Sequence, residues 1–449
     1  MASKKVSRRD FLKIAGATAG GMALAASGSS ALAGVLKAPT RQEEVTLTSN
    51  DFYLGGPGFE PIAEAYREVL DAAGLDWLKY EYQQADTTTL ETRMAAGDAP
   101  DLIYVYPELA QPWAARGQLV SLTPHIEADP DWKADVEAFI PSMNAGYTYN
   151  GELYALTTAA EAECCSFNPD RFEAKGVDSP SAVGKDEFTL EKFHEMNCAI
   201  ADDEMAGYFA HMEFNQGLGD IVACFGGRYF SEDGTQALLN TPEFVAAVEY
   251  VAGMVKDGCA MDGIQSTRDG QWVAAALANQ LCATVIAGDW AWGWAHKTQL
   301  EAGEFEPEMF FIPSGPAGRI AIAHSAGVAV YASTPRMDAA LAFMKMGFTK
   351  EFQEVAAKMY EVAPQFPART DAADPIFEKE LLPAFFTELF EGSIPSPYTP
   401  VLNPYPVYGY MYDMWAEVFK GNDTRSIQEV QDEMNARVQK DLDDAAFFM

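Results

Sequence analysis

The chain has few basic residues for its length of 449, because 31 Lys and Arg stand against 66 Asp and Glu. The formal net charge is -35. A surface of this sign repels phosphate backbones and anionic lipid headgroups. The composition therefore excludes nucleic acid as a partner and argues against docking on an anionic membrane.

Recognisable enzyme motifs are also lacking. The segment Ala323–Gly327 has the Ser and last Gly of a Gly-x-Ser-x-Gly nucleophile elbow, but it begins with Ala. The sequence contains no His-Glu-x-x-His, no phosphate loop ending in Gly-Lys-Ser/Thr and no Gly-x-Gly-x-x-Gly. We therefore expect no catalytic residues and no cofactor. Acidic pairs are so abundant that none of them singles itself out as a glycosidase pair.

Cysteine and histidine are scarce, and their spacing forms no metal-binding pattern. The five His are scattered, and the six Cys contain no Cys-x-x-Cys, so no metal site is predicted. Disulfides and free buried thiols both remain open for an exported chain. For the adjacent Cys164 and Cys165 we expect two strand thiols on opposite faces rather than a strained vicinal disulfide.

An export signal opens the chain. Ser7–Lys13 contains the twin Arg8-Arg9, Ile14–Ala26 is apolar and rich in Gly and Ala, and Ala31-Leu32-Ala33 suits a signal peptidase. We predict a twin-arginine signal peptide over residues 1–33 and a periplasmic, cell-surface or extracellular protein. An uncleaved N-terminal anchor is the alternative.

Strand-like runs alternate with amphipathic helices in the remaining chain, which predicts an α/β fold. Helices are expected over 61–73 and 87–96, each followed by Gly, and later helices from Thr189, Thr241 and Ser426, the last running to about residue 443. Asn150-Gly151 predicts a tight hairpin. A chain this long exceeds the size at which one core stops growing, about 250 to 300 residues, so two lobes with a cleft between them are expected.

The most informative local feature is aromatic. Gly288–Trp294 places three Trp and Asp289 directly after the apolar strand-like run Cys282–Ala287. Indole rings stack on the apolar faces of a sugar while carboxylates and amides bind its hydroxyl rim. The alternative is that the Trp residues pack into a core from one side of a helix.

Several segments together resemble one known family. Met94–Ile103, Asn150–Leu156 followed by Phe167–Phe172, Asn240–Glu243 and Gly288–Trp294 are similar, in order and spacing, to segments of the extracellular sugar-binding components of ABC importers. This is the family that includes maltose-binding protein. The resemblance covers nearly the whole chain after the signal. It implies a non-catalytic protein that captures a solute and delivers it to a membrane permease.

The resemblance implies a two-lobed periplasmic-binding-protein fold of type II that closes around its ligand by a hinge. It places residues 41–159 and 319–366 in one lobe and residues 160–318 and 367–449 in the other. The implied ligand contacts, which combine polar and aromatic side chains, are Asn50, Asp51, Glu108, Glu161, Phe214, Asn215, Gln216, Asp289, Trp290 and Trp292. Trp294 is expected in the core instead.

The implied partners are a neutral mono- or oligosaccharide and the permease subunits of an ABC transporter, with the protein itself a monomer. Thr157-Thr158 and Glu163-Cys164-Cys165 depart from the family pattern in the predicted hinge, so the ligand's identity stays open. Two alternatives remain: another polar solute such as a polyamine, and a secreted carbohydrate-active or redox enzyme. Bound flavin, haem or stoichiometric metal would favour the enzyme.

Overall fold

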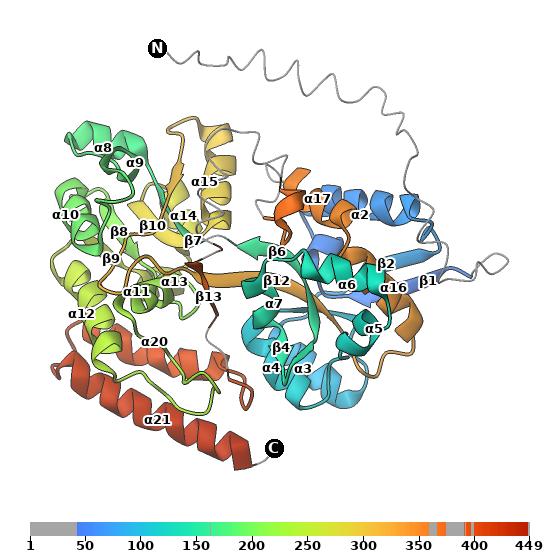
Figure 1. Cartoon of the computed structure of the whole chain (residues 1–449). Coiled ribbons are helices and arrows are strands. Elements are labelled where there is room, and N and C mark those ends of the chain that lie inside the picture. Colours follow the sequence, from blue (N-terminus) through green and yellow to red (C-terminus); the bar gives the residue numbers. More distant parts are fainter. Residues whose placement is uncertain are drawn as a thin grey trace.

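The computed structural model describes residues 43–161, 163–358, 366–373, 390, 392–396 and 399–447. The predicted signal peptide lies outside the described residues. Two lobes lie side by side, and strands β6 and β12 run at their junction (Figure 1). The fold is α/β, as the alternation of elements predicts.

The first lobe is built on a six-stranded sheet of order β13-β12-β3-β1-β2, with β6 also paired to β12. Strand β1 is parallel to β2 and β3, whereas β12 is antiparallel to β3 and β6. Its strands are β1 (Val45–Ser49), β2 (Leu78–Tyr82), β3 (Leu102–Val105), β6 (Ala155–Glu161), β12 (Ile322–Val330) and β13 (Ile394–Pro395).

The helices of the first lobe pack around this sheet and share a core with it. They are α2 (Glu60–Ala72), α3 (Thr87–Ala96), α4 (Pro107–Ala115), α5 (Thr123–Glu127), α6 (Pro130–Glu137), α7 (Pro141–Gly146), α16 (Met337–Gly347) and α17 (Lys350–Lys358), with the short turns η2 (Phe52–Leu54) and η3 (Thr370–Ala372) and the hairpin β4 (Thr148–Tyr149) and β5 (Glu152–Leu153).

The second lobe has a five-stranded sheet of order β11-β7-β10-β8-β9, in which β10 is parallel to β8 and antiparallel to β7. Its strands are β7 (Glu163–Phe167), β8 (Ala206–Ala210), β9 (Ala260–Asp262), β10 (Cys282–Gly288) and β11 (Glu308–Phe310). Its helices are α8 (Pro169–Lys175), α9 (Pro180–Val183), α10 (Leu190–Ile200), α11 (Leu218–Phe225), α12 (Pro242–Lys256), α13 (Gly263–Arg268), α14 (Val273–Ala278), α15 (Asp289–Ala302), α20 (Tyr405–Phe419) and α21 (Ile427–Phe447).

Local chemistry explains where several elements begin and end. Gly74 and Gly97 take positive φ values of 78° and 82° after α2 and α3, and Gly97 donates to carbonyls of the last turn of α3. The Ser426 hydroxyl and Glu429 carboxylate form a reciprocal capping box at the start of α21. Asn150, with φ 49°, makes the tight turn between β4 and β5. These predicted boundaries are confirmed.

The chain crosses between the lobes where β6 ends and again before β12 begins. Strand β6 still pairs with β12 at Glu161, and β7, which begins at Glu163, pairs with β10 in the other sheet. Arg369 forms an ion pair with Asp135 of α6 at 2.7 Å, which holds residues 366–373 against the first lobe. The division of the chain at 159, 318 and 366 stays a prediction.

The cysteines divide into a disulfide and buried thiols. Cys164 and Cys165 are both free and buried in β7, as expected for successive strand residues that point to opposite faces. Cys198 of α10 and Cys259, just before β9, form a disulfide that the sequence leaves open. Among the described residues, no helix has the length and apolarity needed to span a bilayer.

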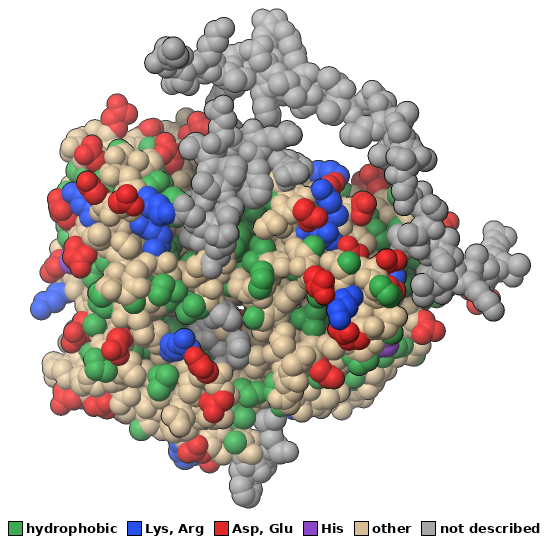
Figure 2. All heavy atoms as spheres, viewed as in Figure 1, with side chains coloured by type: hydrophobic (Ala, Val, Ile, Leu, Met, Phe, Trp, Pro, Cys, Tyr) green, Lys and Arg blue, Asp and Glu red, His purple; other side chains and the backbone are tan. Residues whose placement is uncertain are grey.

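Acidic side chains are spread over both lobes on the face shown in Figure 2. This is the solvated acidic surface that the net charge indicates.

Candidate functional site

The centre of the candidate site is a charged pair at the junction of the lobes. Glu161, the last residue of β6, and His324 of β12 are partners in the antiparallel ladder, which brings their side chains together. The Nδ1 atom of His324 lies 2.8 Å from Oε2 of Glu161. Both residues are buried, with relative exposures of 3 % for His324 and 8 % for Glu161. A buried pair of this kind is oriented by the two strands that carry it.

The environment of His324 favours the imidazolium form. Burial lowers the pKa of the ring, but the nearby carboxylates of Glu161, Glu108 and Glu213 outweigh it and raise the pKa to about 9. The ring is therefore positively charged at neutral pH. In the described part of the chain, Nε2 of His324 has no hydrogen-bond partner. The site thus presents one buried, charge-assisted donor.

The first lobe adds a carboxylate and aromatic rings around this pair. Tyr106 stacks on the His324 ring, with ring centroids 5.3 Å apart and an angle of 23° between the planes. Glu108, in the first turn of α4, is fully buried. Burial raises the pKa of Glu108, although the His324 charge and the hydroxyl of Tyr405 oppose this shift. The Oε2 atom of Glu108 has no hydrogen-bond partner among the described residues.

The second lobe closes the site through Tyr405. Its hydroxyl donates to Oε1 of Glu108 at 2.8 Å, which joins the start of α20 to the start of α4. The edge of the Tyr405 ring faces Phe214, with centroids 6.2 Å apart, and Phe214 in turn stacks on Tyr408 at 3.4 Å. Glu108 and Phe214, both predicted from the sequence, therefore lie on either side of one tyrosine that the prediction omits.

Gly288 brings Trp290 and Gln216 close to the charged pair. A methyl group added at Gly288 would lie 2.5 Å from Nε1 of Trp290 and 3.3 Å from Oε2 of Glu161. The backbone N–H of Gly288 donates to Oε1 of Gln216 at 3.3 Å. The end of β10 in the second lobe therefore approaches the end of β6 in the first, and only glycine leaves the space for this approach.

A row of three indoles extends from this point across the second lobe. Trp290 stacks on Trp272 with centroids 5.4 Å apart and an angle of 7° between the planes, and Trp272 also contacts Trp294 edge to face at 5.2 Å. Trp272 is 37 % exposed and Trp294 is 49 % exposed. The expectation that Trp294 belongs to the core is wrong, because its position on α15 turns the ring to the surface.

Trp292 lies away from Trp290. Its Nε1 donates to the carbonyl of Pro307 at 2.8 Å, and its ring stacks on His296 at 4.8 Å. Residues two apart in a helix point to nearly opposite sides, so α15 separates the two predicted indoles. Asp289, the first residue of α15, is fully buried next to Gly288.

Asn50 and Asp51, which follow β1, accept hydrogen bonds from backbone N–H groups in this structure. The Oδ1 atom of Asn50 accepts a hydrogen bond from the N–H of Tyr104, and Oδ1 of Asp51 accepts one from the N–H of Tyr53. Burial raises the pKa of Asp51 to about 7, although the Tyr53 hydrogen bond opposes the shift. Among the described residues, Oδ2 of Asp51 and Oδ1 of the buried Asn215 have no hydrogen-bond partner.

A family model described as bacterial extracellular solute-binding protein matches residues 68–385. The chain belongs to this family. A model of the twin-arginine translocation signal matches residues 5–25, so this solute-binding protein is exported by that pathway to the periplasm or the cell surface. No curated protein sequence matches it.

Solved structures show the same two-lobed fold. The ABC substrate-binding protein Lmo0181 from Listeria monocytogenes, in complex with cycloalternan, has a TM-score of 0.74 and 19% identity, over 89% of this chain and 99% of its own. The GacH receptor of Streptomyces glaucescens, solved with and without acarbose, has a TM-score of 0.73 and 17% identity, over 90% of this chain and 100% of its own. MalE from Xanthomonas citri, a sugar-binding protein, has a TM-score of 0.71 and 17% identity, over 90% of this chain and 99% of its own.

The sequence reasoning omits several residues that the structure of this solute-binding protein places in the site. His324 lies 163 positions from Glu161, and only strand pairing brings them together. Tyr106 belongs to an aromatic run two residues before Glu108, and that run was the available signal. Tyr405 and Trp272 have no binding motif around them, because Tyr405 lies within a proline-rich stretch and Trp272 precedes a short apolar helix.

Proposed function

We propose that this solute-binding protein captures a neutral mono- or oligosaccharide between its lobes and delivers it to the permease of an ABC transporter. It acts as a monomer and by binding alone, without catalysis. Glu108, Glu161 and His324 bind hydroxyl groups, and Tyr106 and Trp290 contact the apolar faces of the sugar. Gln216, Asn215 and Phe214 complete the second-lobe side.

One observation carries the proposal: at the junction of the lobes, buried polar atoms that have no hydrogen-bond partner among the described residues lie beside aromatic rings. Nε2 of His324 offers a donor, and Oε2 of Glu108 and Oδ1 of Asn215 offer acceptors. A buried polar group without a partner costs about 1–3 kcal/mol, so a ligand that satisfies these atoms recovers that free energy. A sugar hydroxyl both donates and accepts, and it suits a site that presents both kinds of atom.

The ring faces support the same ligand class. Tyr106 lies over His324, and Trp290 reaches the same charged pair through Gly288. The two rings come from different lobes. The three structural relatives named above are described with an oligosaccharide or as a sugar-binding protein, which agrees with a sugar for this chain.

A polyamine is the second candidate, and the carboxylates favour it. Glu108, Glu161 and Glu213 all raise the pKa of His324, and Glu213 also lies 3.6 Å from Nε2 of His211, so the carboxylates outnumber the two imidazoles. A cationic ligand would gain from this excess of negative charge. It would also meet the positive ring of His324, whereas a neutral sugar meets no repulsion.

A thermal-shift screen of sugars and polyamines tests the proposal. A ligand at 100 times its dissociation constant stabilises the protein by about 2.7 kcal/mol, so a binder raises the melting temperature by several degrees. Maltose, maltotriose, cycloalternan and acarbose represent sugars, and spermidine represents polyamines. A shift with spermidine alone, or a turnover product of any sugar, would contradict the proposal.

Glu161→Gln then separates the two ligand classes by titration calorimetry. Hydrogen bonds to charged groups are worth about 1.5–3 kcal/mol, so affinity should fall about 10- to 100-fold. The loss should be nearly independent of salt for a neutral sugar and should shrink at high salt for a polyamine. Glu64→Gln, the same change on the exposed face of α2, is the matched control.

A further inference from the structure

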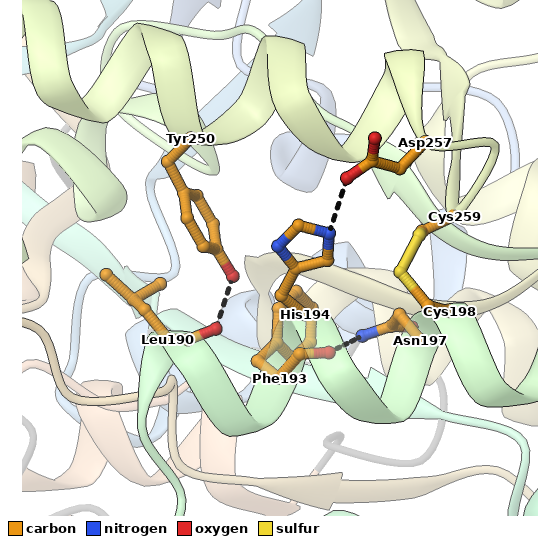
Figure 3. Close-up of a disulfide and its surroundings, with 8 residues drawn as sticks. All are labelled: Leu190, Phe193, His194, Asn197, Cys198, Tyr250, Asp257 and Cys259. Carbon is orange, nitrogen blue, oxygen red and sulfur yellow. Dashed lines mark hydrogen bonds and ion pairs between the residues drawn. A yellow bond between two sulfur atoms is a disulfide. The ribbon is translucent and has the colours of Figure 1, made fainter.

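A second cluster of reactive side chains lies in the other half of the second lobe, around the disulfide (Figure 3). Cys198 of α10 and Cys259, between α12 and β9, have Cα atoms 4.3 Å apart. His194 precedes Cys198 by four residues, so both point to the same side of α10. The potential ligand atoms of His194, Cys198 and Cys259 all lie within 4.8 Å of one another. One imidazole and two sulfurs therefore converge on one point.

Asp257 lies beside His194 and orients its ring. Oδ2 of Asp257, which follows α12, lies 3.4 Å from Nε2 of His194. A carboxylate on one nitrogen of a histidine fixes the orientation of a ring whose other nitrogen can bind a metal. Figure 3 shows the carboxylate and the imidazole on the same side of the disulfide.

The surrounding contacts hold these groups in place. The ring of Tyr250 meets the His194 ring edge to face at 5.8 Å, and the Tyr250 hydroxyl donates to the Leu190 carbonyl at 2.6 Å. Next to Cys198, the Asn197 amide donates to the Phe193 carbonyl at 2.7 Å. The cluster is therefore supported by packing and hydrogen bonds that do not depend on the S–S bond.

The route of export means that this cluster first forms in the cytoplasm with reduced cysteines. The twin-arginine pathway carries folded proteins out of the cytoplasm, where thiols are kept reduced. Cys198 and Cys259 are then two thiols beside His194 in a folded lobe. Spacing along the chain does not reveal this group, because the two cysteines are 61 positions apart.

We infer that the reduced protein binds one Zn²⁺ ion through His194, Cys198 and Cys259, with Asp257 orienting the His194 ring. Two thiolates bound to one tetrahedral Zn²⁺ lie about 3.8 Å apart, so the sulfurs must separate from bonding distance. Rotation of the cysteine side chains is the movement that the proposal requires, and Cys198 lies on the exposed side of α10. The disulfide and the zinc site are alternative states of the same side chains.

The test uses the full exported protein and Zn²⁺ itself. Tris(2-carboxyethyl)phosphine reduces the disulfide: the phosphine takes an oxygen atom from water, and the two sulfurs gain an electron pair and two protons. The phosphine is then removed, and Zn²⁺ is titrated against a coloured chelator. We expect one Zn²⁺ per reduced chain, displacing the two thiol protons, and affinity at least 100-fold weaker in the disulfide form. Co²⁺ should show thiolate charge-transfer and tetrahedral absorption bands in the reduced form alone.

Variants identify the ligands. The double variant Cys198→Ser/Cys259→Ser keeps the four buried thiols of the described chain and should lose the site. His194→Ala should weaken Zn²⁺ binding at least tenfold, whereas His125→Ala, an exposed histidine of α5, should leave it unchanged. Circular dichroism checks the fold of each form.

Three results would overturn the inference. One is equal Zn²⁺ binding by the reduced protein and the double serine variant. Another is a Co²⁺ spectrum without thiolate bands. The third is unfolding on reduction that added Zn²⁺ does not reverse, because the site requires α10 and the end of α12 to keep their relative positions.

Discussion

Replacing Glu161 by Gln should remove the positive charge of His324 at neutral pH. The pKa of His324 is raised from an ordinary value of 6.5 to about 9, and Glu161 is the largest of the carboxylate contributions. A shift of this size corresponds to about 3.4 kcal/mol, since each pKa unit is worth about 1.36 kcal/mol. Burial lowers the pKa, so without Glu161 the ring should be neutral above pH 7.

The sign of the pH dependence follows from the raised pKa. A group whose pKa is higher in the folded state stabilises the fold fully below its unfolded pKa, and this contribution disappears as the pH rises through the folded value. The charged pair should therefore contribute about 3 kcal/mol below pH 6.5, about 2 kcal/mol at pH 7.5 and almost nothing above pH 9. The free energies of unfolding of wild type and Glu161→Gln should converge over that range.

Urea unfolding between about pH 6 and pH 10 measures this difference, and NMR titration of the histidine ring protons reports the pKa of His324 directly. The free energy of unfolding of the exposed Glu64→Gln variant should differ from that of wild type by the same amount at every pH. An unchanged pKa of His324 in Glu161→Gln, or a stability difference that does not vary with pH, would refute the reasoning.

Three further changes test the site. Trp290→Ala should weaken ligand binding by about 0.5–1.5 kcal/mol beyond the loss of buried area, more than Trp294→Ala does, and equal affinities in calorimetry would remove the indole from the site. Tyr405→Phe removes the hydrogen bond to Glu108 and should weaken ligand affinity about tenfold or more. The decrease in the radius of gyration on ligand binding should also be smaller than in wild type. Unchanged affinity and unchanged small-angle scattering would mean that this contact does not hold the lobes together. Gly288→Ala should reduce affinity while the melting temperature changes little, because the added methyl would lie 2.5 Å from Nε1 of Trp290; a variant that binds normally would contradict the close approach.

Local signals in the sequence predict much of the fold. Gly97, Thr189, Thr241 and the Ser426 capping box act within a few residues of themselves, and the helix ends that they predict agree with the structure. The last helix, predicted to about residue 443, continues to Phe447. The family resemblance, which extends along most of the chain, adds the arrangement in two lobes. The protein belongs to that family.

The candidate site is harder to predict because it is assembled from distant segments. Trp290 and Trp292 stand in one motif, yet the helix turns one toward the charged pair and the other toward Pro307. His324 lies in a strand with no local motif, and its role depends on pairing with β6. Periodicity predicts that a strand exists, but the register between two strands depends on the packing of the whole sheet.

The pairing of Glu161 with His324 has a mechanical consequence. The two residues are neighbours in one ladder, directly beside the points where the chain leaves the first sheet. If one lobe rotates about these crossings, atoms near the axis move little, and atoms farther from it move farther. The charged pair then acts as a fixed anchor that is already in position before the lobes close. A ligand held there first loses little entropy in making its first contacts, and the contacts that lie farther from the axis form afterwards.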